Sequence, residues 1–420
     1  MEDKIDIILP QKISILRDKK NQDLVTDKEE YSIYYKNIIH PHCDDYDIQI
    51  ECDVGKNLGH CWRIDSFDGV SGTYDFTVKI YGSRGDLLAV KSAGIEIYEK
   101  KPHRDITLLC IGDSMTQGEV YICHTVQKIH NIKTIGLRNI NGIVNHEGRG
   151  GWTGQGYFDV YEDNGWNVSP FLFPKGYSGK EYFGSKKFWN IVADADLSSK
   201  YIYTGTKAQY IKDGMVCLDN GLLWRYENGS YTEEQKKPEF EFSFSKYMER
   251  YGFDRPDIVS LLFGANEFQF CPYEKAEYEI EKYIDSLRKM VASIKEYDSN
   301  INVIINLPVC GGDQYSWGMR LGCGSSAKQY NYCIKMASEA IVKEFDGRRN
   351  DGIYVCPMIA VCDTVSGFPW EYTKANIYSD REEIHCANWV HPSDIGYKQM
   401  GDALSGVISA VMENSEMYGR

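Results

Sequence analysis

Residues 106–114 have the sequence Ile106-Thr-Leu-Leu-Cys-Ile-Gly-Asp-Ser114, and this stretch decides the predicted fold. Its first part is almost continuously apolar, as in a strand that is buried on both faces of a parallel sheet. The glycine, aspartate and serine that follow favour a turn. We therefore expect a central parallel strand over residues 106–111. Ser114 then lies just beyond its carboxyl end, where open α/β sheets bind ligands.

Strands and helices alternate after this first strand. Residues 258–263 and 301–307 repeat its apolar style, while residues 273–297 and 327–345 carry apolar residues at helical spacing among charges. A last helix-like stretch covers residues 397–412. This alternation predicts an α/β domain over residues 103–420, with a doubly wound parallel sheet flanked by helices.

Two other regions have a different pattern. Residues 1–102 contain short alternating strands, clearest at residues 73–81, and predict an all-β sandwich of immunoglobulin-like or jelly-roll type. It would bind glycan, attach the chain to a larger assembly, or serve only as a spacer. Residues 154–246 are rich in Gly, Tyr, Asn and Ser, and predict a partly β insertion near the active-site side. Such an insertion either contacts substrate or only elaborates the surface.

The composition argues against several classes of protein. The 420 residues carry a formal net charge of -14, which disfavours a broad basic surface for nucleic acid or anionic lipid. No apolar run is long enough to span a membrane, and the first residues lack a signal-peptide pattern. The 13 cysteines form no CxxC pair and favour reduced thiols. We expect a cytoplasmic or virion-associated protein without a cofactor, and the sequence leaves its oligomeric state open.

Two short clusters contain residue types that bind metals. His40, His42 and Cys43 form one, and His385 with Cys386 forms the other. Neither has a spaced second pair of ligands, so ordinary packing explains them better and we expect no metal site.

Four segments carry the groups that acyl transfer requires. Gly112-Asp-Ser114 offers a nucleophile, and Asn388-Trp-Val-His-Pro392 offers a histidine held by the following proline. Gly148-Arg-Gly-Gly-Trp-Thr153 and Gly264-Ala-Asn-Glu267 offer N–H donors for a developing oxyanion. Each segment alone equally suits a turn, a helix cap or a structural histidine. Together they indicate a serine hydrolase, although not the α/β-hydrolase type, whose GxSxG elbow is absent here.

In their order and style, the four segments resemble the SGNH hydrolase superfamily of GDSL-like esterases and lipases. The resemblance covers about residues 106–412, apart from the insertion. It implies that Ser114 is the nucleophile and also an oxyanion donor through its own N–H. It further implies that Gly151 and Asn266 are the other oxyanion donors and that His391 is the general base.

The chain departs from the family pattern three residues before the histidine, where Asn388 replaces the usual aspartate. An amide can orient the imidazole but cannot stabilise imidazolium as a carboxylate does, which predicts a weaker triad or a Ser–His dyad. Asp380, Glu382 or Glu383 are alternative sources of the missing charge. A milder change is Glu267, where an aspartate often follows the asparagine of the family.

The resemblance also suggests a substrate. The segments Glu147-Gly-Arg-Gly-Gly-Trp-Thr153, Ser169-Pro-Phe171 and residues 242–248 resemble the branch that contains carbohydrate esterases. We therefore expect a ping-pong esterase that releases acetate from a sugar hydroxyl, with lipase-like and thioesterase-like roles still open. The candidate substrate-binding residues are Asp113, Trp152 and Trp389, and further tryptophans that suit sugar stacking are Trp166, Trp189 and Trp224.

A second hypothesis comes from another class of protein. The chain would be a binding or structural component of a phage or a surface appendage, with a hydrolase-like domain that has lost activity and β modules that recognise glycan. Asn388 and the long insertion motivate this alternative.

Overall fold

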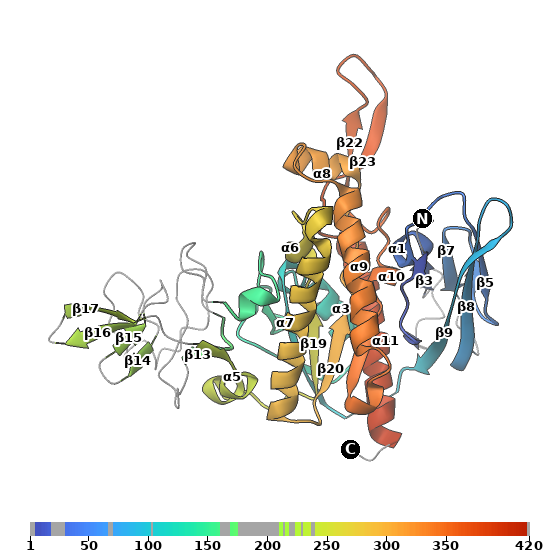
Figure 1. Ribbon diagram of the computed structural model, residues 1–420. Coiled ribbons are helices and arrows are strands. Elements are labelled where there is room, and N and C mark those ends of the chain that lie inside the picture. Colours follow the sequence, from blue (N-terminus) through green and yellow to red (C-terminus); the bar gives the residue numbers. More distant parts are fainter. Residues whose placement is uncertain are drawn as a thin grey trace.

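A parallel sheet forms the middle of the molecule (Figure 1). The computed structural model describes residues 5–17, 30–65, 70–101, 104–159, 169–174, 210–212, 215–217, 223–227, 230–236 and 240–417. The strand order is β11-β10-β19-β20-β21, and β12 runs beside the carboxyl end of β10. The strands are β10 (Ile106–Gly112), β11 (Ile132–Ile135), β12 (Glu147–Gly148), β19 (Ile258–Leu262), β20 (Asn302–Asn306) and β21 (Ile353–Cys356). All of these pairings are parallel, which confirms the predicted α/β sheet.

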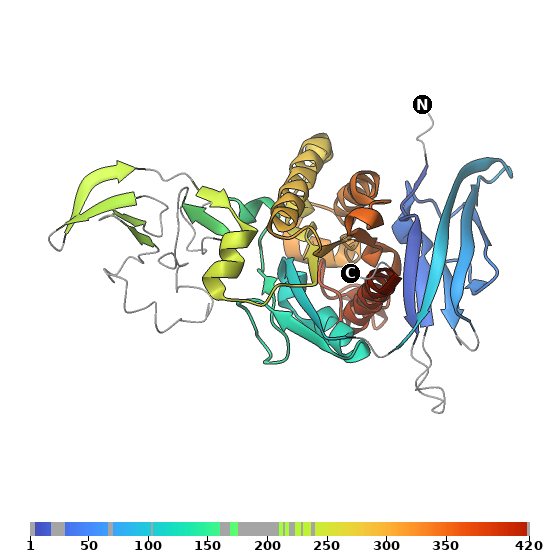
Figure 2. The same cartoon turned by 90° about the horizontal axis from the view of Figure 1, so that it is seen from below.

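Helices cover both faces of this sheet. Figure 2 shows α7 (Ala276–Tyr297) and α9 (Ala327–Phe345) on one face and α3 (Val120–Lys128) and α11 (Asp394–Met417) on the other. In α7, Ile280, Ile284 and Leu287 are buried, which is the three- and four-residue spacing of a helix with one apolar face.

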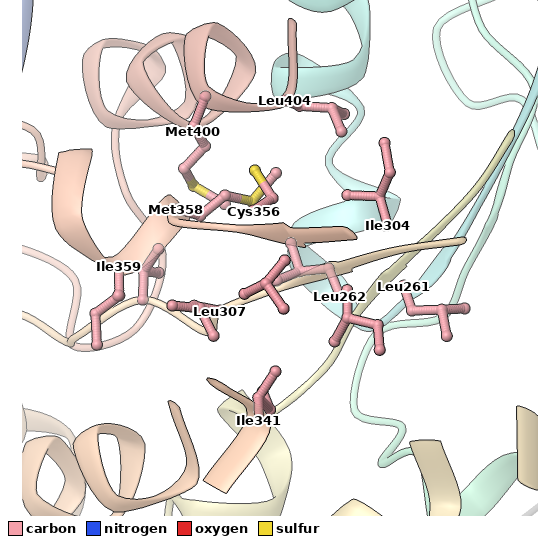
Figure 3. Packing of buried hydrophobic residues seen from close by; sticks show 14 of the residues in the cluster. Leu261, Leu262, Ile304, Leu307, Ile341, Cys356, Met358, Ile359, Met400 and Leu404 are labelled. Carbon is pink, nitrogen blue, oxygen red and sulfur yellow. The ribbon is translucent and has the colours of Figure 1, made fainter. Parts of the chain in front are cut away.

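The core is packed from both sides of the strands. Figure 3 shows Met400 and Leu404 of α11 on one side and Ile341 of α9 on the other. Leu262 and Ile304 lie between them on the strands, and all five side chains are at most 1% exposed. The two helical layers therefore hold the strands, and the loops that follow them, in fixed positions.

The strand order places a candidate site. Strand β11 lies at one edge, on one side of β10, whereas the later strand β19 lies on the opposite side, so the direction of winding reverses between β10 and β19. Such a reversal leaves a crevice at the carboxyl ends of the two strands, where doubly wound sheets bind ligands. The short helices α2 (Ser114–Gln117) and α6 (Ala265–Phe268) begin at these two ends.

The N-terminal region forms two further main sheets. One has the order β2-β9-β8-β5 and the other β3-β7-β6. Their strands are β2 (Lys12–Arg17), β3 (Glu30–Tyr34), β5 (Asp47–Glu51), β6 (Lys56–Asn57), β7 (Cys61–Asp65), β8 (Gly72–Tyr81) and β9 (Leu87–Glu99). In β8, Phe76, Val78 and Ile80 are buried and alternate with more exposed residues, as the period of two predicts. A separate immunoglobulin-like or jelly-roll domain ending at residue 102 stays a prediction.

One strand is longer than the sequence pattern predicts. The pattern marks residues 87–90 and 95–98 as two short strands, but both belong to β9, which continues through the residues between them. Those residues pair with β8, and Gly94 also donates its N–H to the carbonyl oxygen of Gln11. Backbone pairing on both sides therefore keeps the strand continuous where its side chains give no strand signal.

Strand β2 packs directly against helix α11. Ser14 is fully buried, and a Cβ atom on Gly406 would lie 1.9 Å from the Ser14 carbonyl oxygen. Ser405 and Ser409 are also buried on the helix. Small residues therefore allow the helix and the strand to approach closely. The N-terminal sheet and the α/β region share this seam between Ser14 and Gly406.

Replacing Gly406 with alanine should destabilise the protein by about 1–3 kcal/mol, because the added methyl group meets backbone that must move. Urea denaturation followed by circular dichroism would measure the change. Gly318→Ala is the matched control, since a Cβ atom at this helical glycine meets nothing within 4 Å. We expect Gly318→Ala to be neutral or slightly stabilising. If Gly406→Ala is as stable as the wild type, the close packing of α11 against β2 at Gly406 would be contradicted.

The described part of the predicted insertion contains β structure. Strands β14 (Tyr210–Lys212), β15 (Met215–Cys217), β16 (Leu223–Glu227) and β17 (Ser230–Lys236) form one antiparallel sheet, which lies to one side in Figure 1. Strand β13 (Leu172–Pro174) contributes to the hydrophobic core. It pairs with β18 (Phe240–Phe242), and Phe171 stacks on Phe242. Trp166, Trp189 and the side chain of Trp224 lie outside the described residues.

The remaining elements are short. They are β1 (Asp6–Ile7), α1 (Tyr35–Ile38), β4 (Ile39–His40), α5 (Phe244–Tyr251), α8 (Gln314–Leu321), α10 (Met358–Val361), β22 (Trp370–Lys374) and β23 (Glu382–Cys386). Strands β22 and β23 form a hairpin that projects from the α/β region beside α8 (Figure 1). Among the described residues, no helix combines the length and apolarity needed to cross a membrane.

Candidate active site

Ser114 lies at the end of the central strand, on the first turn of α2. The chain turns sharply there because Gly112 leaves room for its neighbours: a Cβ atom on it would lie 2.4 Å from the Leu262 carbonyl oxygen. Asp113 caps the helix, since its Oδ1 accepts the Met115 N–H at 2.9 Å. Strand β10 and this cap together fix the position of Ser114.

His391 meets Ser114 across the carboxyl end of the sheet. His391 Nε2 lies 2.8 Å from Ser114 Oγ, although the residues are 277 positions apart in the chain. His391 lies in the loop just before α11, and Pro392 follows it. Burial lowers the pKa of His391, so the imidazole is neutral and able to accept a proton at neutral pH. The structure thus brings together the two residues that the sequence proposed as nucleophile and base.

Asn388 orients the backbone of His391. Its Oδ1 accepts the N–H groups of Val390 at 3.1 Å and of His391 at 2.9 Å, which makes a tight turn around the side-chain amide. Both contacts are to the main chain rather than to the imidazole, so the predicted role of Asn388 in orienting the ring stays a prediction. In the part of the chain that the structure describes, no carboxylate forms an ion pair with His391.

The acidic residues upstream do not supply that charge. Glu383 lies on β23, where it pairs with Arg381 at 3.4 Å and His385 at 3.7 Å, and Glu382 is exposed on the same strand. Asp380 lies in the turn of the projecting hairpin. The hypothesis that Asp380, Glu382 or Glu383 orients His391 therefore finds no support, because hairpin pairing directs this segment away from the histidine loop.

The predicted oxyanion donors lie on loops at the same end of the sheet. Gly151 has a φ of 80°, which favours glycine, and it follows β12. Asn266 follows β19 and donates one N–H of its Nδ2 to the Trp152 carbonyl oxygen at 2.9 Å, which leaves its second N–H. Among the described residues, the backbone N–H groups of Ser114 and Gly151 have no hydrogen-bond acceptor.

A buried polar network supports the Gly151 loop, and no motif in the sequence predicted it. Glu147 Oε1 accepts the Tyr247 hydroxyl at 2.7 Å and the Leu137 N–H at 2.8 Å, while its Oε2 pairs with Arg149 at 2.8 Å. All of these polar side chains are buried. The sequence signal for this network was the pair of charged residues Glu147 and Arg149 in the otherwise glycine-rich stretch 147–151.

His146 and Glu119 extend this network. His146 Nδ1 accepts the Gly148 N–H at 2.9 Å, and its Nε2 lies 2.9 Å from Glu119 Oε1. Glu119 has a φ of 64°, an uncommon conformation for glutamate, and also accepts the Asn141 N–H at 3.0 Å. Burial lowers the pKa of His146. No local pattern marked these residues, because they meet only in the folded chain.

Two carboxyl groups beside the site have raised pKa values. Burial raises the pKa of Asp113 to about 7, and Asp113 Oδ2 has no hydrogen-bond partner among the described residues. Burial, with a smaller contribution from the nearby Asp113, raises the pKa of Glu267 to about 7. Asp113 is 1% exposed, so it acts as a helix cap rather than as the substrate contact suggested by the sequence.

The two tryptophans predicted to contact substrate occupy different environments. Trp152 is 2% exposed and packs edge-on against Tyr157, so its ring offers no open face for a sugar. This burial corrects the expectation for Trp152, whose backbone carbonyl serves the site instead. Trp389 is only partly buried and lies under the Arg320 guanidinium, which is 5.0 Å from the ring centroid.

The candidate metal ligands have other contacts. His385 stacks on Tyr315 with ring centroids 3.8 Å apart, and His42 Nδ1 lies 3.8 Å from Asp44. Within the described ranges, no three His, Cys, Asp or Glu side chains gather as metal ligands would.

Comparisons with known proteins yield structural similarity only. No protein-family model matches the chain, and no curated protein matches its sequence. A possible lipase from Chitinophaga pinensis is 11% identical, with a TM-score of 0.36 over 73% of this chain and 99% of the other. A carbohydrate esterase family 3 structure from Talaromyces cellulolyticus is 10% identical, with a TM-score of 0.33 over 74% and 99%.

A third similar structure is a carbohydrate acetylesterase family member from Sinorhizobium meliloti, 12% identical with a TM-score of 0.34 over 73% of this chain and 99% of that one. The similar structures thus include a possible lipase, a carbohydrate esterase and a carbohydrate acetylesterase family member. At these scores and identities they assign neither a family nor an activity to this chain.

Proposed function

We propose that the chain is a serine ester hydrolase of the SGNH type, in which Ser114 is the nucleophile and His391 the general base. The observation that carries the proposal is the 2.8 Å approach of His391 Nε2 to Ser114 Oγ at the switch point of the sheet. A nucleophile and base at hydrogen-bond distance are the minimum that covalent acyl transfer requires.

The reaction has two halves. His391 Nε2 takes the proton from Ser114 Oγ as the oxygen attacks the ester carbonyl, and the tetrahedral intermediate then expels the alcohol, which receives that proton. Water next attacks the acyl-serine ester and gives a proton to His391. Collapse of the second intermediate releases the acid and returns the proton to Ser114. The N–H groups of Ser114, Gly151 and Asn266 would hold the oxyanion in both halves.

The proposed centre works as a Ser–His dyad. Imidazolium forms in each half-reaction, and among the described residues no carboxylate is paired with His391 to stabilise it. Burial also disfavours the charged ring, as its lowered pKa indicates. A dyad of this kind is a weaker catalyst than a triad with an aspartate, but its oxyanion donors still act.

Replacing Asn388 with aspartate should raise kcat and shift the acidic limb of the pH profile upward. The aspartate keeps an acceptor for the N–H groups of Val390 and His391, and its charge favours imidazolium. We expect a gain of a few-fold to about tenfold, since one pKa unit corresponds to ~1.4 kcal/mol. Steady-state hydrolysis of p-nitrophenyl acetate between pH 5 and 9 would measure it, with Asn376→Asp in the hairpin turn as the control. An unchanged profile would mean that the added charge does not reach the imidazole.

For the substrate, we propose O-acetyl groups on a carbohydrate. The support is the resemblance of residues 147–153, 169–171 and 242–248 to the carbohydrate-esterase branch. The test is acetate release from a panel of acetylated glycans, followed by labelling with a fluorophosphonate and mapping of the modified peptide. Acetate release with the label on Ser114 is expected. A label on any other serine would overturn the nucleophile assignment.

A second candidate function follows from the missing carboxylate partner of His391. The chain would then bind glycan without hydrolysing it, as a structural component. Binding of acetylated glycan by a wild type that neither releases acetate nor reacts with the fluorophosphonate would favour this alternative.

A further inference from the structure

We infer that Glu267 is a positioning residue that holds the two oxyanion-donor loops in register, an inference that rests on the proposed esterase function. Its carboxylate accepts one N–H from each loop. Glu267 Oε1 accepts the Gly154 N–H at 2.6 Å, and Oε2 accepts the Gly264 N–H at 3.0 Å. Gly154 lies three residues after Gly151, and Gly264 lies two residues before Asn266.

The bond to Gly264 alone would be ordinary helix capping. A glutamate at the third position of a helix often accepts the N–H of the capping residue, here Gly264 at the start of α6. The bond to Gly154 goes further, because this N–H belongs to a loop that follows β12 and lies 113 residues away in the chain. One side chain therefore joins the end of β19 to the loop beside β10.

A second cross-link lies next to the first. Asn266 Nδ2 donates to the Trp152 carbonyl oxygen at 2.9 Å, and Trp152 is the neighbour of Gly151. The two bonds run between the same loops, one on each side of residue 153. Movement of one loop away from the other would therefore lengthen both bonds and move the donors of Gly151 and Asn266 apart. Oxyanion donors act through fixed geometry, so such a shift weakens stabilisation of the transition state more than substrate binding.

The position requires two acceptors, and an ionised carboxyl provides two strong ones. A glutamine would present an NH₂ group to one of the two N–H donors, and a protonated glutamate would present a hydroxyl oxygen, which is a weaker acceptor than a carboxylate oxygen. Glutamine therefore removes the anchor of one loop, and protonation weakens it. The ionised form of Glu267 is therefore the form that keeps the two donor loops together.

The surroundings of Glu267 set the pH at which this form is lost. Helix α6 packs against α7 and α9, which contribute Tyr283 and Tyr330, and Asp113 approaches from the end of β10. Burial keeps both tyrosines neutral by raising their pKa values well above 10. Burial and the negative charge of Asp113 raise the pKa of Glu267 to about 7, so the anchor weakens as the pH falls through neutrality.

The test compares pH–rate profiles of wild type and Glu267→Gln with p-nitrophenyl acetate. Wild type should show two ionisations on its acidic side, one near pH 7 from Glu267 and a more acidic one from His391, whose pKa burial lowers. Glu267→Gln should lose the upper ionisation and about 10-fold to 100-fold in kcat, with little change in KM, somewhat less than removal of a whole donor. Glu267→Asp, which keeps the charge, should retain the ionisation and part of the activity. The exposed Glu277→Gln on α7 is the control for loss of one charge.

Two outcomes would overturn the inference. One is a wild-type profile with a single ionisation, a result that needs no variant and so decides the matter even if Glu267→Gln fails to fold. The other is an active Glu267→Gln that keeps both kcat and the upper ionisation, which would assign the ionisation to Asp113. A wild type without hydrolysis or fluorophosphonate labelling would instead remove the proposed esterase function itself.

Discussion

Replacing Ser114 with alanine should lower kcat for p-nitrophenyl acetate by at least ~10³-fold, because the covalent step loses its nucleophile. Residual hydrolysis would come from the oxyanion donors and from binding, which the substitution leaves in place. The fold should persist, since Asp113 still caps α2 and no described residue depends on the Ser114 hydroxyl except His391. Initial rates at pH 8, with the unfolding midpoint of each protein, would measure both effects.

The matched control is Ser325→Ala, a serine of similar partial exposure whose hydroxyl donates only to the Gln269 carbonyl oxygen. It should retain activity within a few-fold of wild type. If Ser114→Ala hydrolyses the ester as fast as wild type does, Ser114 is not the nucleophile and the proposed mechanism fails.

Replacing His391 with alanine should lower kcat by about 10³-fold, because the serine hydroxyl is then left without a base. His391 should also determine how the activity of the wild type changes at acidic pH. Burial lowers the pKa of His391, so the neutral base persists to a more acidic pH than an ordinary histidine would, and activity is lost as the pH falls through this pKa. His391→Ala should lose this ionisation together with its activity.

Added imidazole offers a direct check on His391→Ala, since it can enter the space left by the ring and restore part of the rate. His385→Gln is the control: this histidine lies six residues upstream, is partly buried and stacks on Tyr315 rather than contacting Ser114. Retained activity in His391→Ala, or equal losses in the two variants, would contradict the assignment of the base.

Much of the α/β region was predictable from the sequence because its elements are long and strongly periodic. The expected helix over residues 327–345 coincides with α9, and the apolar run at 106–111 with all but the last residue of β10. Strands β11 and β21 were not predicted. Each has only four residues, and periodicity over so short a stretch does not separate a strand from a loop.

The candidate site likewise contains some residues that the sequence predicted and some that it did not. The resemblance of four short motifs to the SGNH family implied the pairing of Ser114 with His391 and the roles of Gly151 and Asn266. Three of these motifs follow β10, β12 and β19, whose carboxyl ends a parallel sheet brings to one edge, whereas His391 lies in the loop before α11. Trp152 was misplaced, because composition does not reveal which face of a tryptophan is covered. The contacts of Glu267 with Gly154 and of His146 with Glu119 join distant segments. Only the folded chain reveals such contacts.

The seam between Ser14 and Gly406 also bears on how the chain is made. Strand β2 leaves the ribosome long before α11, because most of the other elements lie between them in the sequence. The face of β2 that packs on α11 therefore stays uncovered while nearly all the intervening chain is synthesised. Exposed apolar strands are sites of aggregation in partly folded proteins. The nascent chain should accordingly need a chaperone until α11 emerges and covers β2.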